Sequence, residues 1–501
     1  MHLKTSLMVR LALFLGLNDV ALGADLQEAQ VLAAMKRATS FMMNTVSNRG
    51  GFLWHYSEDF SKQWGEVPAR KSQIWVQPPG STTNVGMMLL KAAAATNDPD
   101  YLKYADRVAG ALIWGQLPSG GWHYFIDFDM PGVQKWYEEV ASQCRGWEEF
   151  YHYYGNATFD DDTTTSAARF LLEIYSTTLD PKFRPALMKA LDFILQAQYP
   201  NGSWPQRYPL RNDFPHDGRA DYTSFYTYND EVISNNIYLL LDSYEKLGNE
   251  EYLKAARRGM DFYIISQLSP PQAGWALQYE MDLKPGWARS YEPASLCSDQ
   301  TVENIRDLQN FYMITGDRRY LEPIPKAIQW LESSIIAKGP SKDFTHATFY
   351  EVGSNKPLYA RHEVKDGKIS SYRVGYEEFD LPSYGGRRRF DVAALKKGFE
   401  AIRNLNPQQA SAEYRRRMQE RTKLAASSID LGKAERIVAS LDAKGAWITP
   451  IEFLDIDNYA DNPPLRFKGI DTKMYTSNME TLIACVSRLR ETGQGRADRK
   501  K

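Results

Sequence analysis

A short phrase, an acidic or amide residue followed by an aromatic residue three positions later, recurs four times in the first two-thirds of the chain. The copies begin at Asp98, Asp180, Asn249 and Asp317, and their aromatic residues are Tyr101, Phe183, Tyr252 and Tyr320. The aromatic residue recurs at intervals of 82, 69 and 68 residues. After the first three copies a turn ends in Trp122, Trp204 or Trp275, at 21, 21 and 23 residues from the aromatic residue. A spacing held this closely through a helical pattern indicates a structural repeat.

Each copy of the phrase lies between two helical patterns. The upstream helices are expected at residues 85–95, 164–176, 232–246 and 302–312, with apolar residues such as Phe170, Leu171 and Ile174 at helical spacing. The repeating unit is therefore a helical hairpin, and stacked hairpins form either an open solenoid or an (α/α) toroid. The repeat predicts an all-α fold and leaves that choice open.

One segment departs from the helical pattern. Residues 343–380 contain two strand-like stretches, 348–352 and 370–374, with Asp366-Gly367 between them, which predicts a small β-hairpin insertion. Helical patterns then resume and continue to about residue 489. We predict one domain over residues 24–492, followed by a charged, frayed tail over residues 493–501.

The first 23 residues have the pattern of a secretory signal. Lys4 and Arg10 precede the apolar run 11–17, and Ala21-Leu22-Gly23 has the small-residue spacing of a cleavage site before Ala24. The mature protein is expected to be exported to the periplasm or the extracellular medium. Nothing later approaches the roughly 20 apolar residues of a membrane-spanning helix, so no membrane partner is expected.

Charge and cysteine content exclude further classes. The chain has 60 basic and 62 acidic residues, a net charge of −2, and so lacks the basic field that collects nucleic acid. Its three cysteines, Cys144, Cys297 and Cys485, are an odd number spread over a long chain, so no disulfide framework is expected. We predict a monomer held together by a large apolar core.

Acidic residues recur at one place in the repeat. Asp160 lies 23 residues before Phe183 and Asp230 lies 22 residues before Tyr252, so both stand at the start of an inner helix. In stacked hairpins these starts share one face, and loops on such a face usually carry the binding groups. The other candidates on that face are Asp161, Asp162, Trp204, Asn229, Glu231, Tyr279, Arg289 and Glu292.

Carboxylates from two loops beside an Asn amide are hard oxygen ligands of the kind that Ca²⁺ prefers. The alternative for each Asp is a helix N-cap. Three acidic residues in a row at Asp160, matched by a pair at Asp230, exceed what capping needs, so metal binding is favoured. The repeated tryptophans also have two interpretations, packing between hairpins or sugar stacking; packing is favoured, and Trp204 is the candidate for both.

Four ordered motifs resemble those of the family 10 pectate lyases. They are ATFDDDTT at 157–164, QYPNGSWPQ at 198–206, YNDE at 228–231 and ARSYEPAS at 288–295, with a weaker likeness in FYEVGSNKP at 349–357. The resemblance covers most of residues 85–365 and implies an (α/α) toroid. It also implies cleavage of α-1,4-polygalacturonate by calcium-assisted β-elimination, which gives unsaturated oligogalacturonides.

The resemblance assigns roles residue by residue. Asp160, Asp161 and Asp230 would be the Ca²⁺ ligands, and Arg289 would be the base that removes the C5 proton of a galacturonate. Calcium would act as a Lewis acid on the substrate carboxylate and would lower the pKa of a buried Arg289, which ordinarily lies above about 12. The substrate-binding residues would be Trp204, Arg207, Asn229, Tyr279, Tyr291, Glu292 and Arg361.

Three alternatives remain beside a lyase. The first is an (α/α)-barrel glycoside hydrolase that acts on uronic-acid sugars with two carboxylates, and the second is a non-catalytic pectin-binding relative. A triterpene cyclase is disfavoured, because its acidic motif needs a further Asp at the position of Phe159. A lyase product absorbs in the ultraviolet and a hydrolase product does not.

Overall fold

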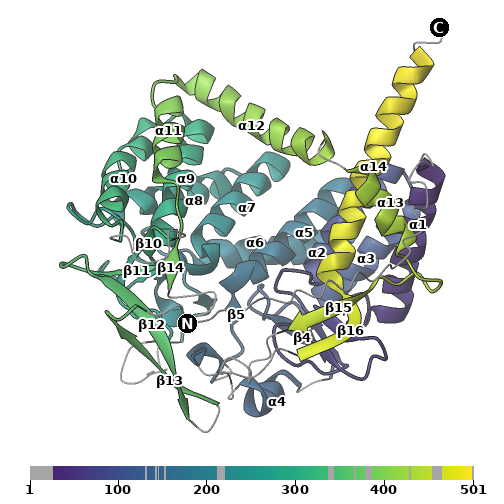
Figure 1. Ribbon diagram of the computed structural model, residues 1–501, viewed down its shortest axis with the longest axis horizontal. Helices are drawn as coiled ribbons and strands as arrows, with labels where there is room; N and C mark the ends of the chain where they lie inside the picture. Colours follow the sequence, from purple (N-terminus) through teal and green to yellow (C-terminus); the bar gives the residue numbers. More distant parts are fainter. Residues whose placement is uncertain are drawn as a thin grey trace, which may run out of the picture.

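The computed structural model is predominantly helical, as the repeat predicts (Figure 1). It describes residues 26–129, 132–141, 144, 146–151, 154–211, 221–336, 344–365, 368–378, 386–427, 430–453 and 465–498. The predicted signal peptide, residues 1–23, lies outside this part of the chain. No helix among the described residues combines the length and the apolar character needed to cross a membrane.

The predicted helical hairpins are confirmed. They are α2 (Thr82–Thr96) with α3 (Pro99–Trp114), α5 (Thr163–Thr178) with α6 (Arg184–Ala197), α7 (Val232–Leu247) with α8 (Glu250–Ile265), and α9 (Ser298–Thr315) with α10 (Ile324–Ser333). The recurring phrase is an N-cap followed by a buried anchor: Asp98, for example, accepts a hydrogen bond from Asp100 N at 2.9 Å, and Tyr101 is buried behind it. Asp180, Asn249 and Asp317 accept the equivalent bond, and Phe183, Tyr252 and Tyr320 are buried in the same way.

The tryptophan turns pack between hairpins, as favoured. The indole N–H of Trp122 donates to Leu112 O at 2.8 Å, and Trp204 makes the equivalent bond to Ile194 O at 2.8 Å. Trp275 bonds Tyr263 O in the same way, and Trp447 adds a copy that the sequence analysis missed, with Ile437 O as its acceptor. Gly202 in one of these turns has φ +99°, and a Cβ there would lie 2.0 Å from Arg258 O, so the turn needs glycine.

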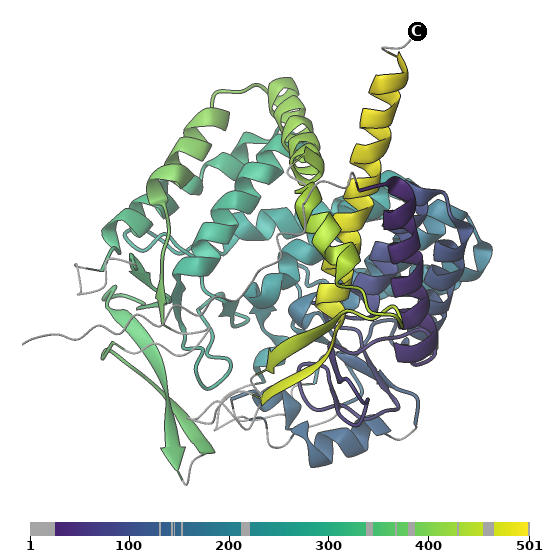
Figure 2. The ribbon, with the colours of Figure 1, turned by 45° about the vertical axis from the view of Figure 1, so that its right-hand side comes forward.

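The remaining helices bring the two ends of the chain together. They are α1 (Glu28–Phe41), α4 (Gly132–Glu139), α11 (Val392–Ile402), α12 (Pro407–Ser427), α13 (Leu431–Ala439) and α14 (Thr472–Asp498). Helix α14 contacts α1, α2, α12 and α13, and Tyr475 on α14 donates to Thr39 on α1 at 3.0 Å (Figure 2). Helix α14 continues through much of the predicted tail, to Asp498.

Two four-stranded antiparallel sheets accompany the helices. One has the order β15 (Ile448–Phe453), β16 (Leu465–Asp471), β1 (His55–Ser57), β2 (Gln63–Trp64), and the other has the order β13 (Lys368–Gly375), β12 (Pro357–Lys365), β11 (Phe349–Glu351), β9 (Ser295–Cys297). The predicted hairpin is therefore wrong in its pairing: β13 pairs with β12, and β11 lies on the other side of β12. The predicted turn at residues 366–367 lies outside the described residues. The first sheet was not predicted.

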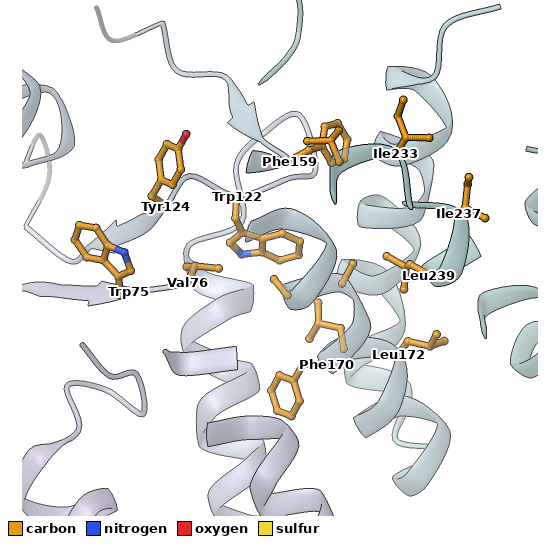
Figure 3. Close-up of a cluster of buried hydrophobic side chains, with 14 of the residues drawn as sticks. Trp75, Val76, Trp122, Tyr124, Phe159, Phe170, Leu172, Ile233, Ile237 and Leu239 are labelled. Carbon is orange, nitrogen blue, oxygen red and sulfur yellow. The ribbon is translucent and has the colours of Figure 1, made fainter. Parts of the chain in front are cut away.

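Short strand pairs tie the loops of one face together. They are β3 (Gln73–Trp75) with β4 (Phe125–Asp127), β5 (Ala157–Thr158) with β6 (Arg207–Tyr208), β7 (Tyr226–Thr227) with β8 (Gln278–Tyr279), and β10 (His346–Ala347) with β14 (Arg387–Arg388). A continuous apolar core lies beneath them, in which Trp122 and Phe159 pack near Phe170 and Ile233 (Figure 3). All three cysteines are buried, and none of them is in a disulfide.

Candidate active site

Two equivalent turns, η4 (Asp160–Asp162) and η7 (Asn229–Glu231), lie against each other at the starts of α5 and α7. Each contains two successive non-glycine residues in the left-handed region: Asp161 and Asp162 with φ 50° and 59°, and Asp230 and Glu231 with φ 52° and 58°. Neither N-cap residue, Asp162 or Glu231, makes a side-chain capping bond. The capping interpretation is therefore wrong here, and the strained backbone aims the acidic side chains elsewhere.

Arg289 is the centre on which these turns converge. Its side chain is only 9% exposed. Nη2 donates to Asp160 Oδ2 at 2.9 Å, and Nε and Nη2 both donate to Glu149 Oε1, at 2.9 and 2.6 Å. Nη1 makes the longer contacts, 3.3 Å to Glu292 Oε1 and 3.5 Å to Asp230 Oδ2. One guanidinium thus joins carboxylates from four loops.

Two further residues extend the acidic centre toward the N-terminal part of the chain. Gln77 Nε2 donates to Asp161 Oδ2 at 2.6 Å and to Glu66 Oε2 at 3.0 Å. The carboxylates around Arg289 are then Glu66, Glu149, Asp160, Asp161, Asp230 and Glu292, and the guanidinium groups among them are Arg289 and Arg207. The centre carries a large excess of negative charge in a place with little water.

The shifted pKa values of the acidic side chains reflect this excess of negative charge. Burial, and then the charge of Asp160, raises the pKa values of Asp161 and Asp230 well above their ordinary value. Burial raises the pKa of Glu66 to about 7. Burial also works against ionised Asp160, but Arg289 and further hydrogen bonds hold its pKa below the ordinary value.

Arg289 itself has a raised pKa among these carboxylates. Burial alone would lower the pKa of Arg289, but the charges of Glu149, Asp160 and Glu292 raise it well above its ordinary value. The fall in the pKa of Arg289 was expected for a calcium-bound site and stays a prediction, because the carboxylates by themselves shift this pKa upward. It requires that the charge of these carboxylates be offset.

The donor set fits a hard divalent cation in its chemistry. Asp160 Oδ1 is buried and has no hydrogen-bond partner, and the neighbouring ligands are carboxylate oxygens in excess of the available cations. Across the described residues, no three His, Cys, Asp or Glu side chains are placed so as to hold a metal ion together. The arrangement explains this, since Asp160 and Asp230 both turn an oxygen toward Arg289.

The structure divides the predicted substrate-binding residues into four groups. Asn229 and Glu292 lie in the acidic centre, where Asn229 Nδ2 donates to Asp230 Oδ2 at 2.9 Å and to Glu292 Oε1 at 3.3 Å. Tyr291 is next to the centre, and its hydroxyl accepts from Trp147 Nε1 at 2.9 Å. Arg361 is on β12 and pairs with Glu377 at 2.9 Å, so it is not brought to the centre.

The other three are buried beneath the surface. Trp204 and Tyr279 are completely inaccessible, so their predicted contact with substrate is wrong: both side chains hold loops in place. Arg207 is also buried, and its Nη1 donates to the backbone oxygen of Glu149 at 2.8 Å. Its cation supports the loop that clamps Arg289.

Four residues of the centre were missed by the sequence analysis: Glu66, Gln77, Tyr124 and Glu149. Tyr124 donates to Asp160 Oδ2 at 2.7 Å, and Tyr222 donates to Glu149. Glu66, Gln77 and Glu149 lie in none of the motifs recognised in the sequence, and Tyr124 lies two residues after the repeated Trp122. The acidic pair Glu148-Glu149 between aromatic residues was the one available sign.

A helical scaffold whose loops bury several carboxylates around one arginine defines a candidate active site on an α-helical fold. The chain belongs to the pectic acid lyase family, whose model matches residues 116–378. This membership supports polysaccharide lyase activity. The matched region contains Glu149, Asp160, Asp230 and Arg289, whereas Glu66 lies outside it.

Solved structures show more distant likenesses. A family 10 polysaccharide lyase from Cellvibrio cellulosa is 19% identical, with 55% of this chain and 84% of that chain covered and a TM-score of 0.38. A mutant of that lyase in complex with trigalacturonic acid is 18% identical, with 56% and 86% covered and a TM-score of 0.38. A glycoside hydrolase family 76 mannosidase from Bacteroides thetaiotaomicron is 11% identical, with 93% and 99% covered and a TM-score of 0.42. A search of curated proteins by sequence found no match.

Proposed function

We propose that this protein is a pectate lyase that cleaves α-1,4-polygalacturonate by calcium-assisted β-elimination. The observation that carries the proposal is the placement of Arg289, which is held among Glu149, Asp160, Asp230 and Glu292 inside the region that matches the pectic acid lyase family. A polyanion needs a counter-charge to approach so many carboxylates. A divalent cation supplies it.

Asp160, Asp161 and Asp230 are the residues that would hold Ca²⁺. Asp160 Oδ1 has an uncommitted, buried lone pair, and the raised pKa values of Asp161 and Asp230 show that their ionised forms lack compensation. Bound calcium would neutralise the C6 carboxylate of galacturonate and stabilise the negative charge that develops when the C5 proton leaves. It would also offset part of the charge that now raises the pKa of Arg289.

Arg289 in its neutral form, which a bound cation would favour by offsetting the charge of the surrounding carboxylates, would accept the C5 proton at Nη1. Its Nε and Nη2 atoms are fixed by Glu149 and Asp160, whereas both contacts of Nη1 are longer, at 3.3 and 3.5 Å. As the C5–H bond breaks, its electron pair forms the C4–C5 double bond and the C4–O bond breaks. The departing glycosidic oxygen takes a proton from water. The products are an unsaturated sugar end and a new free hydroxyl end.

The test is the incubation of the mature protein with polygalacturonate, with and without a chelator. We expect a steady rise in ultraviolet absorbance that stops in chelator and returns when Ca²⁺ is added in excess. New reducing ends without absorbance would establish a hydrolase instead. Binding without either signal would establish a non-catalytic relative.

One observation favours the hydrolase as second candidate. The carboxyl of Glu66, with its pKa raised to about 7, is protonated in part at neutral pH and suits a general acid. It shares the side chain of Gln77 with Asp161, so two carboxyls with different environments lie close together. The absorbance assay separates the two reactions directly.

We further propose that the hairpins close into an (α/α) toroid. The proposal is supported by the contacts of α14, which packs against α2 at one end of the helical series and against α12 at the other. We also propose export as a monomer after removal of residues 1–23. Light scattering of the exported protein should give the monomer mass, and its N-terminal sequence should begin at Ala24.

A further inference from the structure

The end of α3 carries an exposed aromatic pair beside a cavity. Trp114, the last residue of α3, is 49% exposed, and its ring centroid lies 4.7 Å from that of Phe128. Trp114 also lines a cavity of about 390 Å³ together with Phe125 and Asp127 of β4. That volume lies in the range of small-ligand pockets. None of the residues assigned above to the acidic centre lines it.

Arg49 stands at the edge of this aromatic pair. Its guanidinium carbon lies 4.7 Å from the ring centroid of Phe128 and 6.0 Å from that of Trp114. Arg49 is exposed, and among the described residues no carboxylate lies within ion-pair distance of it. A guanidinium laid against aromatic rings is held in position while its N–H groups remain able to bind a carboxylate.

The cavity also provides hydrogen-bonding groups. The carboxylate of Asp127 is fixed by Gln73 Nε2 at 3.1 Å and by Asp129 N at 3.0 Å, and Gln116 and Gln134 line the same space. Aromatic faces with a small number of fixed polar groups are the usual recognition elements for a sugar ring. The guanidinium of Arg49 beside the cavity favours a sugar that carries a carboxylate.

Packing within the repeat does not explain the tryptophan. Gln116 Nε2 donates to Gly120 O and to Ala186 O, and Gln267 Nε2 makes the equivalent pair of bonds to Ala273 O and Pro323 O. These two glutamines are equivalent positions in two repeat units. Trp114 lies two residues before Gln116, and Ile265 lies two residues before Gln267. Ile265 is 50% exposed, so the scaffold does not need an aromatic side chain at this position.

We propose that Arg49, Trp114 and Phe128, with the cavity beside them, form a second carbohydrate-binding site that takes one uronic-acid unit of the polymer. The choice of galacturonate as the probe rests on the proposed function. Tyr124, which immediately precedes β4, donates to Asp160, so a single segment connects the second site to the acidic centre. The second site would anchor the polymer while another part of it lies at Arg289.

The test measures the binding of trigalacturonate to the full chain by calorimetry in the presence of chelator. Under these conditions the carboxylates of the acidic centre repel the probe, so binding reports the second site. We expect Trp114→Ala to weaken binding about fivefold or more, and Trp114→Phe to weaken it less. We expect Arg49→Gln to weaken binding and Arg49→Lys to restore part of it. Ile265→Ala, the matched variant, should bind as the wild type does.

Three outcomes would overturn the second site: no binding of trigalacturonate in chelator, equal binding by Trp114→Ala and wild type, or equal binding of a neutral galactose trimer that Arg49→Gln does not change. These outcomes are independent of the absorbance assay. Binding that depends on Trp114 in a protein that forms no unsaturated product would keep the second site and refute the lyase. Formation of the unsaturated product by a protein whose trigalacturonate binding does not depend on Trp114 would keep the lyase and refute the second site.

Discussion

Arg289 and a bound cation would share the same carboxylates, so removal of Arg289 should affect stability and calcium affinity in opposite directions. The change Arg289→Gln leaves Glu149 and Asp160 without the partner that now lies 2.6 and 2.9 Å away. Removing one member of a buried ion pair costs about 3–5 kcal/mol. We therefore expect Arg289→Gln to lose free energy of unfolding of about this size when a chelator is present, measured as a lower denaturant midpoint.

Calcium should then bind more tightly. Two unit charges 4 Å apart interact by about 4 kcal/mol at an effective dielectric constant of ~20, and the ion is divalent. In the wild type, local relaxation would reduce the repulsion between Arg289 and Ca²⁺ only in part. We expect Arg289→Gln to bind Ca²⁺ at least about tenfold more tightly, a change of about 1.4 kcal/mol, in a calorimetric titration. Saturating Ca²⁺ should accordingly return most of the lost stability.

Two controls make this result specific. Arg289→Lys keeps the positive charge and should gain less affinity for Ca²⁺. Arg319→Gln removes an exposed arginine that pairs with Asp317 and Asp261, and it should leave Ca²⁺ binding unchanged. If Arg289→Gln binds Ca²⁺ no more tightly than the wild type, the arginine and the ion do not share carboxylates. The assignment of the metal to Asp160 and Asp230 would then be wrong.

Four further predictions concern single side chains. Asp230→Asn should abolish most turnover and weaken Ca²⁺ binding without lowering the unfolding midpoint in chelator, because it removes a poorly compensated charge; a large drop in that midpoint would make Asp230 structural. Arg289→Lys should lose kcat rather than raise KM if the residue is the base, whereas near-normal kcat with a raised KM would make it a substrate ligand. The pKa of Glu66 is raised on folding from 4.5 to about 7, so its ionisation destabilises the fold as pH rises through that window. Glu66→Gln should therefore gain stability relative to wild type between pH 4.5 and 7, and a flat difference would contradict the burial argument. Trp204→Phe should lower stability by about 1–3 kcal/mol, since Ile194 O loses its donor, and should leave KM unchanged; a raised KM would return Trp204 to substrate binding.

The helical hairpins could be predicted because their determinants are local. The side chain of Asp98 accepts a hydrogen bond from the backbone N–H of Asp100, and Tyr101 is buried one residue further along. The phrase alone therefore marks the start of the helix. The unit that ends at Trp447 was missed for the same reason. Its helix α13 is capped by Asp430, which accepts from Gly432 N at 2.9 Å, but no aromatic anchor follows the cap.

The sheets could not be predicted because their partners are distant in the sequence. Strand β1 pairs with β16, so that His55 faces Asp471, and no turn between them signals the pairing. Strand β11 was expected to pair with the segment around Tyr372, but β12 lies between them. Strand propensity was visible at both places, whereas the order of the strands depends on packing against the helices.

The acidic centre was predicted in part. The equivalence of Asp160 and Asp230 followed from counting residues to the next anchor, and the contact between η4 and η7 confirms that they meet. Arg289 was chosen only through the family resemblance. Glu149 and Glu66 come from irregular loops, where no period places a side chain, so their approach to Arg289 and Asp161 could be found only in the structure.

The strained turns connect the fold to the proposed chemistry. A non-glycine residue in the left-handed region costs of order 1 kcal/mol, and η4 and η7 each contain two in succession. Glycine would remove that strain but would also remove the carboxylates of Asp161 and Asp230. The chain thus accepts backbone strain to place carboxylates that then lack enough cations around them. The proposed cation would offset both costs together, so its removal should affect stability and turnover through the same side chains.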